Sequence, residues 1–256
     1  MAAYDVIGNI AIVKFARGVK VSEKKKWGAR FLKEHMAVRT VLEKAEKFSG
    51  RLRTLKTNYI AGEKTKEALY KENGCVFRLN VDNCYFSPRL STERAEIASF
   101  VKKGERVLVM FGGVAPFAIV IGKMSKASEI VSVELGRECT KYAEENVRRN
   151  KLFGRVKIVG GDVRRKIPGM DKFDRIVMAR PNLKDSFLDA AFSVIRKGGV
   201  IHYYGFCSAD EVGGLKELIL GEAKNVGKKV KILKVKKAGE IGVRKWRWRV
   251  DLKIEK

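Results

Sequence analysis

The sequence predicts an α/β protein in which a doubly wound parallel sheet follows a small N-terminal α+β domain. Three observations lead to this expectation. From about residue 94 onward, short apolar segments alternate with segments of helical periodicity. A glycine pair, Gly112-Gly113, directly follows the first of these apolar segments. The last segment alternates between apolar and polar residues, which is typical of a strand with one apolar face. We place the domains at residues 1–80 and 81–256.

The N-terminal domain combines strand-like and helix-like segments. Ser22 can cap a helix whose apolar residues, from Trp27 to Met36, recur at helical spacing. Strands are expected over residues 6–15, 38–42 and 53–61. A helix packed on a few strands would give this domain a core of its own.

Repeated strand–helix units fill the second domain. The predicted strands cover residues 106–111, 130–134, 156–159, 175–178 and 200–204. The predicted helices cover residues 116–121, 139–150, 185–195 and 209–225. Such repeats favour parallel strands with helices on both faces of the sheet.

The C-terminal segments predict a closing antiparallel pair of strands, over residues 230–235 and 246–254. In the second segment Trp246 and Trp248 begin an apolar face, and Arg247 begins the polar face. We therefore expect both tryptophans to anchor the core rather than to stack on the bases of a nucleic acid.

The net charge is the strongest compositional signal. The chain has 55 Lys and Arg against 29 Asp and Glu, which gives +26 and a pI of about 10.0. Such an excess repels itself unless a polyanion is near, and phosphate backbones bind basic proteins through counterion release. Because the basic residues are spread over the whole chain, RNA is favoured over an anionic membrane surface. The alternative is a lysine-rich surface adapted to a hot or salty habitat.

Cysteine and histidine usage gives no sign of a metal site. The four cysteines form no C-x-x-C pair, and the two histidines stand far apart in the sequence. We expect reduced thiols in a cytoplasmic protein. The N-terminus carries no apolar signal segment, and the longest apolar stretch, residues 107–122, is too short for a bilayer. We expect neither a metal nor a membrane partner.

Three strand ends predict a Rossmann-like site for a nucleotide-type cofactor. Gly112 and Gly113 let a ligand approach the backbone after the first strand. Glu134 ends the second strand about twenty residues later, where an acid can accept hydrogen bonds from ribose hydroxyls. Asp162 follows the third strand, where it can accept from an adenine amine. Each signal alone is unspecific, but neighbouring parallel strands end at the same edge of the sheet.

A longer and more specific motif precedes the sheet. Residues 85–94 read YFSPRLSTER, residues 72–75 upstream read ENGC, and residues 200–204 downstream read VIHYY. These motifs resemble those of the archaeal and eukaryotic tRNA (guanine(37)-N(1))-methyltransferase family. Its members typically read ENGC, YFSPRLxxER, DMFAGVGPF, GDVR, MNLP and GGVIHYY. The resemblance covers nearly the whole chain, and the family's extra N-terminal domain for the tRNA elbow is not expected here.

The resemblance implies a class I methyltransferase sheet and methyl transfer from S-adenosylmethionine to N1 of guanine 37, beside the tRNA anticodon. Guanine N1 carries a proton at neutral pH, so a carboxylate must take that proton as the methyl group arrives. Glu93 matches the position of the family's proposed base. Charge moves toward O6 as N1 loses its proton, and by approximate alignment Arg53 is the guanidinium that would stabilise it. The partner implied is the anticodon stem-loop of tRNA, bound by a monomer.

The strand ends and the resemblance together assign the other site residues. The expected cofactor-binding residues are Tyr85, Phe111, Gly112, Gly113, Pro116, Phe117, Glu134, Asp162, Val163 and Pro181. The residues expected to contact the tRNA are Arg89, Arg94, Arg180 and Asn182. From the pattern alone, Glu93 and Arg94 would instead form the exposed start of a helix that Thr92 caps.

Three positions depart from the family pattern. Val109 replaces the acid of DMFAG, Ala115 replaces the last glycine of that loop, and Ala179 replaces the Asn of MNLP. An Ala115 methyl group would crowd a close approach to the backbone, and the loss of the Asn removes a polar group where base and cofactor meet.

These departures keep other functions open. One is an aminocarboxypropyl transferase of the wybutosine pathway, against which Arg89 argues. Another is methylation of the wyosine intermediate on the same fold. A third is a non-catalytic tRNA-binding homologue, which the intact Glu93, Glu134 and Asp162 disfavour.

Overall fold

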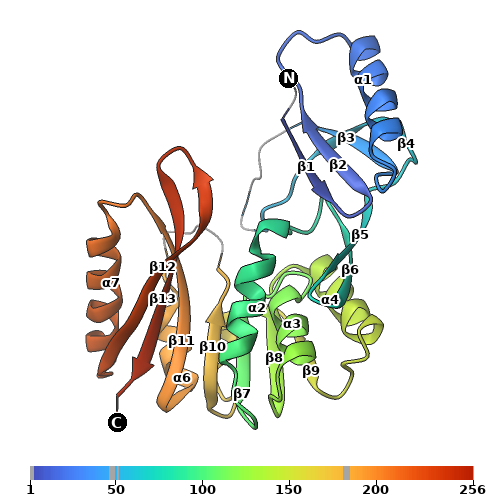
Figure 1. Cartoon of the computed structure of the whole chain (residues 1–256). Helices are drawn as coiled ribbons and strands as arrows, with labels where there is room; N and C mark the ends of the chain where they lie inside the picture. The colour runs from blue at the N-terminus through green and yellow to red at the C-terminus, as the bar shows by residue number, and fades with distance from the viewer. Residues whose placement is uncertain (1–2, 46–49, 51, 181–184, 256) are drawn as a thin grey trace.

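A computed structural model describes residues 3–45, 50, 52–180 and 185–255 and shows two parts (Figure 1). A small four-stranded sheet with one helix stands above a seven-stranded sheet that helices flank. The α/β class and the Rossmann-like sheet predicted from the sequence are confirmed. The boundary between residues 80 and 81 stays a prediction.

The small sheet has the strand order β1-β2-β3-β4. Its strands are β1 (Ala3–Ile7), β2 (Ile10–Lys14), β3 (Thr40–Lys44) and β4 (Thr57–Gly62). Helix α1 (Val21–Glu34) buries Gly28 and Phe31 against this sheet, and Lys20 rather than Ser22 stands at its N-cap.

The single strand expected over residues 6–15 is wrong, because the chain turns back at Gly8 to form the hairpin β1–β2. Gly8 has a φ of +57°, and a β-carbon there would lie 1.9 Å from the carbonyl oxygen of Leu69. A residue with a side chain would meet both a strained dihedral and a clash. The β-branched residues on both sides hid this turn.

A hairpin that the strand analysis missed joins the two parts. Strand β5 (Glu67–Glu72) pairs antiparallel with β6 (Cys75–Asn80). The turn consists of Asn73 and Gly74, both with positive φ, as a two-residue type I′ turn requires. The backbone of β6 is fastened to a helix of the large sheet, since the side-chain oxygens of Asn146 and Asn150 accept hydrogen bonds from it, both at 2.8 Å.

The large sheet has the strand order β12-β13-β11-β10-β7-β8-β9. Its parallel strands are β7 (Arg106–Met110), β8 (Glu129–Glu134), β9 (Val156–Gly160), β10 (Phe173–Met178) and β11 (Ile195–Cys207). Strands β12 (Val230–Gly242) and β13 (Lys245–Ile254) form the predicted antiparallel closing pair. The order of strands reverses at β7, which is the point where ligands bind in such sheets.

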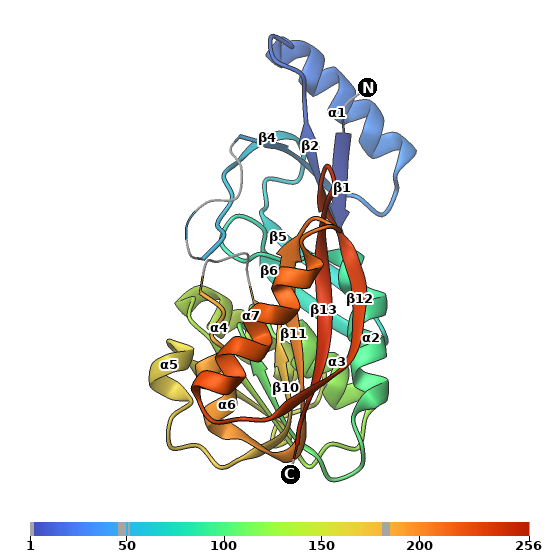
Figure 2. The same ribbon diagram turned by 90° about the vertical axis from the view of Figure 1, so that its left-hand side faces the viewer.

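Helices cover both faces of this sheet (Figure 2). One face carries α2 (Ser91–Phe100), α3 (Pro116–Met124) and α4 (Arg137–Arg149). The other face carries α5 (Val163–Lys166), α6 (Leu188–Val194) and α7 (Val212–Asn225). Val107 and Val109 of β7 join the first core, whereas Leu108 and Met110 join the second. Burial on both faces explains why β7 reads as a continuous apolar run.

The closing strand β13 differs from the expectation in two respects. Trp248 is buried, as expected, and its indole nitrogen donates to the carbonyl of Cys207 at 3.2 Å. Trp246 is only half-buried, and the ammonium of Lys237 lies 4.1 Å from its ring centroid. On the opposite face Arg249 is fully buried, because helix α2 packs over it.

Candidate functional site

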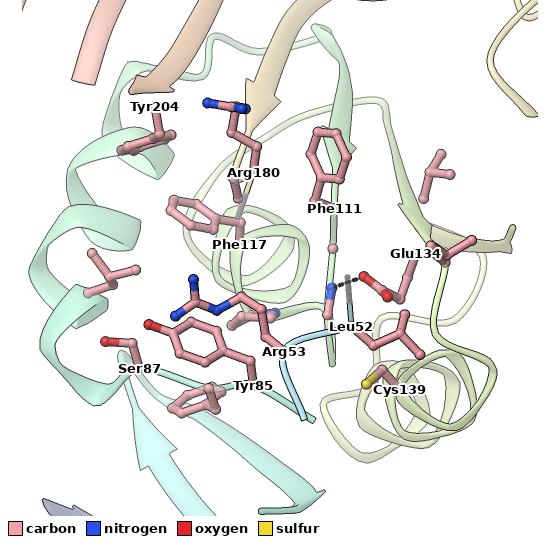
Figure 3. A pocket seen from close by; sticks show the side chains of 18 of the residues that line it. Leu52, Arg53, Tyr85, Ser87, Phe111, Phe117, Glu134, Cys139, Arg180 and Tyr204 are labelled. Carbon is pink, nitrogen blue, oxygen red and sulfur yellow. Dashed lines mark hydrogen bonds between the residues drawn. The ribbon is translucent and has the colours of Figure 1, made fainter. Parts of the chain in front are cut away.

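A pocket opens beyond the carboxyl ends of the central strands (Figure 3). The ends of β7 and β8 form one side of it, and Tyr204 of β11 lies at another. Leu52 and Arg53 reach it from the N-terminal part of the chain. The pocket is therefore built from both parts of the molecule.

Glu134 organises the glycine turn after β7. One of its carboxylate oxygens accepts from the backbone N–H of Gly113 at 2.7 Å, and the other accepts from Gly136 at 2.6 Å. Burial raises the pKa of Glu134, and the hydrogen bonds from Gly136 and Gly113 act in the opposite direction. A β-carbon at Gly112 would lie 2.1 Å from the hydroxyl of Ser132, so a side chain there would displace that hydroxyl of β8. The carboxylate and the open backbone face the same space.

The third predicted strand end joins the same pocket. Asp162 follows β9 and caps α5, since its carboxylate accepts from the N–H of Arg164 at 2.9 Å. Val163 lines the wall beside it. The predicted cofactor residues that line this one pocket are Tyr85, Phe111, Gly112, Gly113, Pro116, Phe117, Glu134, Asp162 and Val163. Pro181 and Asn182 lie outside the described residues.

Arg53 and Tyr85 form the wall that faces the glycine turn. The guanidinium carbon of Arg53 lies 4.4 Å from the ring centroid of Tyr85, and both residues line the pocket. Arg53 has a φ of +53° and lies in the turn before β4, not in the strand that we expected from residue 53. An arginine stacked on an aromatic ring keeps its donors in a fixed plane.

The two arginines of the YFSPRLSTER motif have different positions. Arg94 lines the pocket, and its guanidinium makes a two-pronged ion pair with Glu72 that is almost completely buried. Arg89 does not line the pocket. It is exposed and pairs with Asp5 of β1.

Glu93 is buried, which contradicts the exposed helix start that the local pattern suggests. Its oxygen Oε1 accepts from the hydroxyl of Tyr204 and from Nη1 of Arg249, both at 2.7 Å. Glu93 itself does not line the pocket, whereas Tyr204 does. Helix α2 begins at Ser91, and Thr92 does not cap it.

The three positions that depart from the family pattern lie in different environments. Val109 and Ala115 are fully buried in the core and do not line the pocket, so the Ala115 methyl group does not crowd it. Ala179 does line the pocket, next to Arg180. Nη1 of Arg180 donates to the hydroxyl of Tyr203 at 3.2 Å, and burial lowers the pKa of the Arg180 guanidinium.

Sequence reasoning missed several residues of the site. Tyr204 belongs to a motif that the sequence displayed, but the motif alone assigned it no role. The remaining lining residues without a predicted role are Leu52, Phe86, Ser87, Leu90, Val133, Leu135, Cys139, Phe206 and Arg247. Phe86, Ser87 and Leu90 belong to the YFSPRLSTER motif, but the motif alone assigned them no role. The place of the others in the wall depends on how distant elements pack.

Two negative observations concern only the part of the chain that the structure describes. Within it, no three side chains of His, Cys, Asp or Glu are grouped so that they could hold a metal ion. Within the same residues, no helix is both long and apolar enough to cross a bilayer.

Comparison with known proteins gives a consistent result. A sequence model of the TRM5/TYW2 methyltransferase domain matches residues 68–236. The tRNA (guanine(37)-N(1))-methyltransferase Trm5b of Pyrococcus abyssi is 36% identical over 253 residues, which are 98% of this chain and 74% of that protein. Its crystal structure covers 99% of this chain and 75% of its own, with a TM-score of 0.88 and 35% identity.

One further relative is named for two activities, and one further structure contains a tRNA. The tRNA (guanine(37)-N(1))/4-demethylwyosine(37)-methyltransferase Taw22 of Nanoarchaeum equitans is 32% identical over 98% of this chain and 99% of its own length. The complex structure of aTrm5 and tRNALeu has a TM-score of 0.85 and 27% identity, over 99% of this chain and 72% of that one.

Proposed function

The chain belongs to the TRM5/TYW2 methyltransferase family, and we propose that it transfers a methyl group from S-adenosylmethionine to N1 of guanine 37 in tRNA. The observation that carries this proposal is a single pocket with two kinds of wall. One wall has the strand ends typical of a nucleotide cofactor site, with the carboxylate of Glu134. The other has Arg53, Tyr85 and Tyr204, and Glu93 lies directly behind the last of these.

The residues of the first wall fit S-adenosylmethionine. Glu134 would accept hydrogen bonds from the ribose hydroxyls, and Asp162 would accept from the adenine amine. The backbone at Gly113 leaves space for the ligand, because the nearest atom to a β-carbon placed there is 3.8 Å away. Phe117 and Val163 would flank the apolar parts. When bound, the cofactor supplies a methyl group that is electrophilic because it is bonded to a positively charged sulfur.

The second wall would hold the guanine. We assign Glu93 as the group that finally receives the N1 proton and Arg53 as the guanidinium that stabilises charge on O6. The base next to the anticodon is stacked in its loop, so it must turn out of the loop to reach this wall. Arg94 would hold the wall in place through Glu72, and Arg180 would contact the nucleotide.

The partner in this proposal is tRNA, with the anticodon stem-loop at the pocket. The net charge of +26 supports it, because a basic protein can bind the phosphate backbone of tRNA. Such phosphate contacts position a nucleic acid without reading its sequence. Arg89, which is exposed, remains a candidate contact to the RNA, and so does Asn182. We propose a monomer that acts in the cytoplasm, which the four free cysteines support.

A labelled-cofactor assay tests the proposal. The protein is incubated with methyl-labelled S-adenosylmethionine and tRNA transcripts that carry G or A at position 37, and the labelled nucleoside is identified after digestion. We expect label in 1-methylguanosine from the G37 transcript alone. Label in another nucleoside, or label from both transcripts, contradicts the proposal. Tight tRNA binding without cofactor binding would indicate a non-catalytic homologue.

A second activity has a specific observation in its favour. The relative in Nanoarchaeum equitans carries both the guanine and the 4-demethylwyosine activity in its name and matches this chain over 99% of its own length. The same pocket would then accept 4-demethylwyosine at position 37. The assay is repeated with tRNA that carries this base. Transfer of an aminocarboxypropyl group, measured with cofactor labelled in that group, would place the chain in the other branch of the family.

A further inference from the structure

Tyr204 separates Glu93 from the pocket. The phenol ring lines the pocket (Figure 3). Its hydroxyl donates to Oε1 of Glu93 at 2.7 Å. The carboxylate behind it does not line the pocket. The same oxygen of Glu93 accepts a second hydrogen bond from Arg249, and the other oxygen faces the ammonium of Lys236 at 3.6 Å. A base placed in the pocket would therefore meet Tyr204 before it met Glu93.

We propose that Tyr204 is a catalytic residue that relays the guanine N1 proton to Glu93. This inference rests on the proposed function and adds a residue to its reaction. The N1–H bond breaks, and the proton passes to the phenol oxygen of Tyr204. The proton already on that oxygen passes to Oε1 of Glu93. The N1 electron pair forms the bond to the methyl carbon, and the electron pair of the broken carbon–sulfur bond stays on sulfur.

The surroundings of Tyr204 suit a relay rather than a base. Burial and the neighbouring charge of Glu93 raise the pKa of Tyr204 well above its usual value of 10.0. The hydroxyl therefore keeps a proton at neutral pH and can accept one only while it gives one away. A hydroxyl has lone pairs free for this purpose while its own hydrogen points to Glu93.

The charges around Glu93 tolerate the arrival of a proton. Arg249 has two other acidic neighbours, Glu96 at 2.9 Å and Asp251 at 3.0 Å. Lys236 also pairs with Glu96. When Glu93 becomes neutral, neither cation is left without a carboxylate. A buried cation that lost its last partner would oppose the transfer.

Direct proton transfer to Glu93 is less compatible with this geometry. It would require the base to reach past the ring of Tyr204, which is itself almost fully buried. The relay uses the hydrogen bond that already joins Tyr204 to Glu93.

The test compares Tyr204→Phe, Glu93→Gln and the double variant in single-turnover assays with saturating S-adenosylmethionine and G37 tRNA. We expect each single variant to lower the rate by about 10²-fold, and the double variant to be no slower than the slower single variant, because the two residues act as a unit. Calorimetric binding of the cofactor should stay unchanged in all three.

Tyr142→Phe is the matched control, because the hydroxyl of Tyr142 also donates to a glutamate, Glu67, but does not line the pocket. We expect this variant to keep the full rate. The pH profile gives an independent readout. The rate of Tyr204→Phe should rise about tenfold per pH unit toward the pH at which guanine N1 ionises in water, whereas the unaltered protein should show a flatter profile.

The possible failures can be told apart. If the unaltered protein forms no 1-methylguanosine, the proposed function is wrong, and the proposed relay is then wrong as well. If the unaltered protein is active and Tyr204→Phe loses less than about threefold, the relay alone is wrong. Losses that multiply in the double variant also overturn it, since they would show that Tyr204 and Glu93 act separately.

Discussion

Arg94 and Glu72 form a two-pronged ion pair whose side chains are only 1% and 2% exposed. Nε and Nη2 of Arg94 each donate to one oxygen of the Glu72 carboxylate. Nη2 also donates to the backbone carbonyl of Ser87 at 3.1 Å. The pair fastens helix α2 to the end of the β5–β6 hairpin. Since Glu93 is the adjacent residue of α2, this ion pair also fixes the start of the helix that carries the proposed base.

Removing one partner of this pair should destabilise the protein strongly. We expect Arg94→Met to lower the free energy of unfolding by about 3–5 kcal/mol, because a buried carboxylate is left unpaired. The double variant Glu72→Gln/Arg94→Met should be less destabilised than Arg94→Met, since no charge is stranded. Denaturant unfolding followed by circular dichroism measures both. Equal losses in the two variants would show that the lost packing of Arg94 dominates instead.

Glu134→Gln should weaken cofactor binding without unfolding the protein. The amide cannot accept from Gly113, Gly136 and two ribose hydroxyls at once, and a charged hydrogen bond contributes about 1.5–3 kcal/mol. We expect the dissociation constant for S-adenosylmethionine to rise at least about tenfold in calorimetry. Glu138→Gln, at an exposed position of α4, is the control and should bind normally.

The same carboxylate predicts a pH dependence of cofactor affinity. Burial raises the pKa of Glu134, so its protonated fraction grows as the pH falls toward that pKa. A protonated carboxyl accepts hydrogen bonds poorly, and affinity should fall on acidification. The Glu134→Gln variant should lack this dependence. An affinity of the unaltered protein that does not fall on acidification would contradict the assignment of Glu134 to the ribose.

Arg53→Ala should lower the turnover number by about 10²-fold and leave cofactor affinity unchanged, because the guanidinium is assigned to charge that develops only in the transition state. Arg53→Lys should recover little of the loss, since an ammonium cannot stack on Tyr85 as a planar group does. Steady-state kinetics with G37 tRNA measures both. Arg196→Ala removes an exposed arginine that pairs with Asp174 and should behave as the unaltered protein does. A loss confined to KM would move Arg53 from catalysis to tRNA binding.

The sequence predicted the large sheet well because local periodicity determines most of it. Strand β7 is apolar on both faces, and the helices between the strands bury one side each. The strand ends at Gly113, Glu134 and Asp162 could be assigned to one pocket because parallel strands finish at the same edge. For these residues, position along the chain was enough.

The environment of Glu93 could not be predicted in this way. Glu93 and Arg249 are 156 residues apart in the chain, and their contact depends on α2 packing over β13. The alternation in β13 correctly placed Arg249 on the face opposite the apolar residues, but it did not predict that Arg249 is buried there. The turn at Asn73 and Gly74 was a local signal for the β5–β6 hairpin, but it was interpreted only as part of a motif.

Glu96 makes a prediction about acid stability. Hydrogen bonds from Arg249 and Lys236 lower the pKa of Glu96 from 4.5 to about 2. Because the folded pKa is below the unfolded one, the stabilisation is complete above pH about 4.5 and is lost as the pH falls toward 2. A shift of this size corresponds to about 3 kcal/mol. The unfolding free energies of the unaltered protein and of Glu96→Gln should therefore converge by roughly this amount between pH 5 and 2.

The comparison with Glu96→Gln isolates this carboxyl from the others that titrate in the same range. Glu144→Gln, at an exposed position of α4, serves as the control, and its stability should follow that of the unaltered protein throughout. Denaturant unfolding at several pH values gives the three curves. If the curve of Glu96→Gln runs parallel to that of the unaltered protein, then Glu96 is not held ionised by Arg249. The charge balance that lets Glu93 accept a proton would then have to come from Asp251 and not from Glu96.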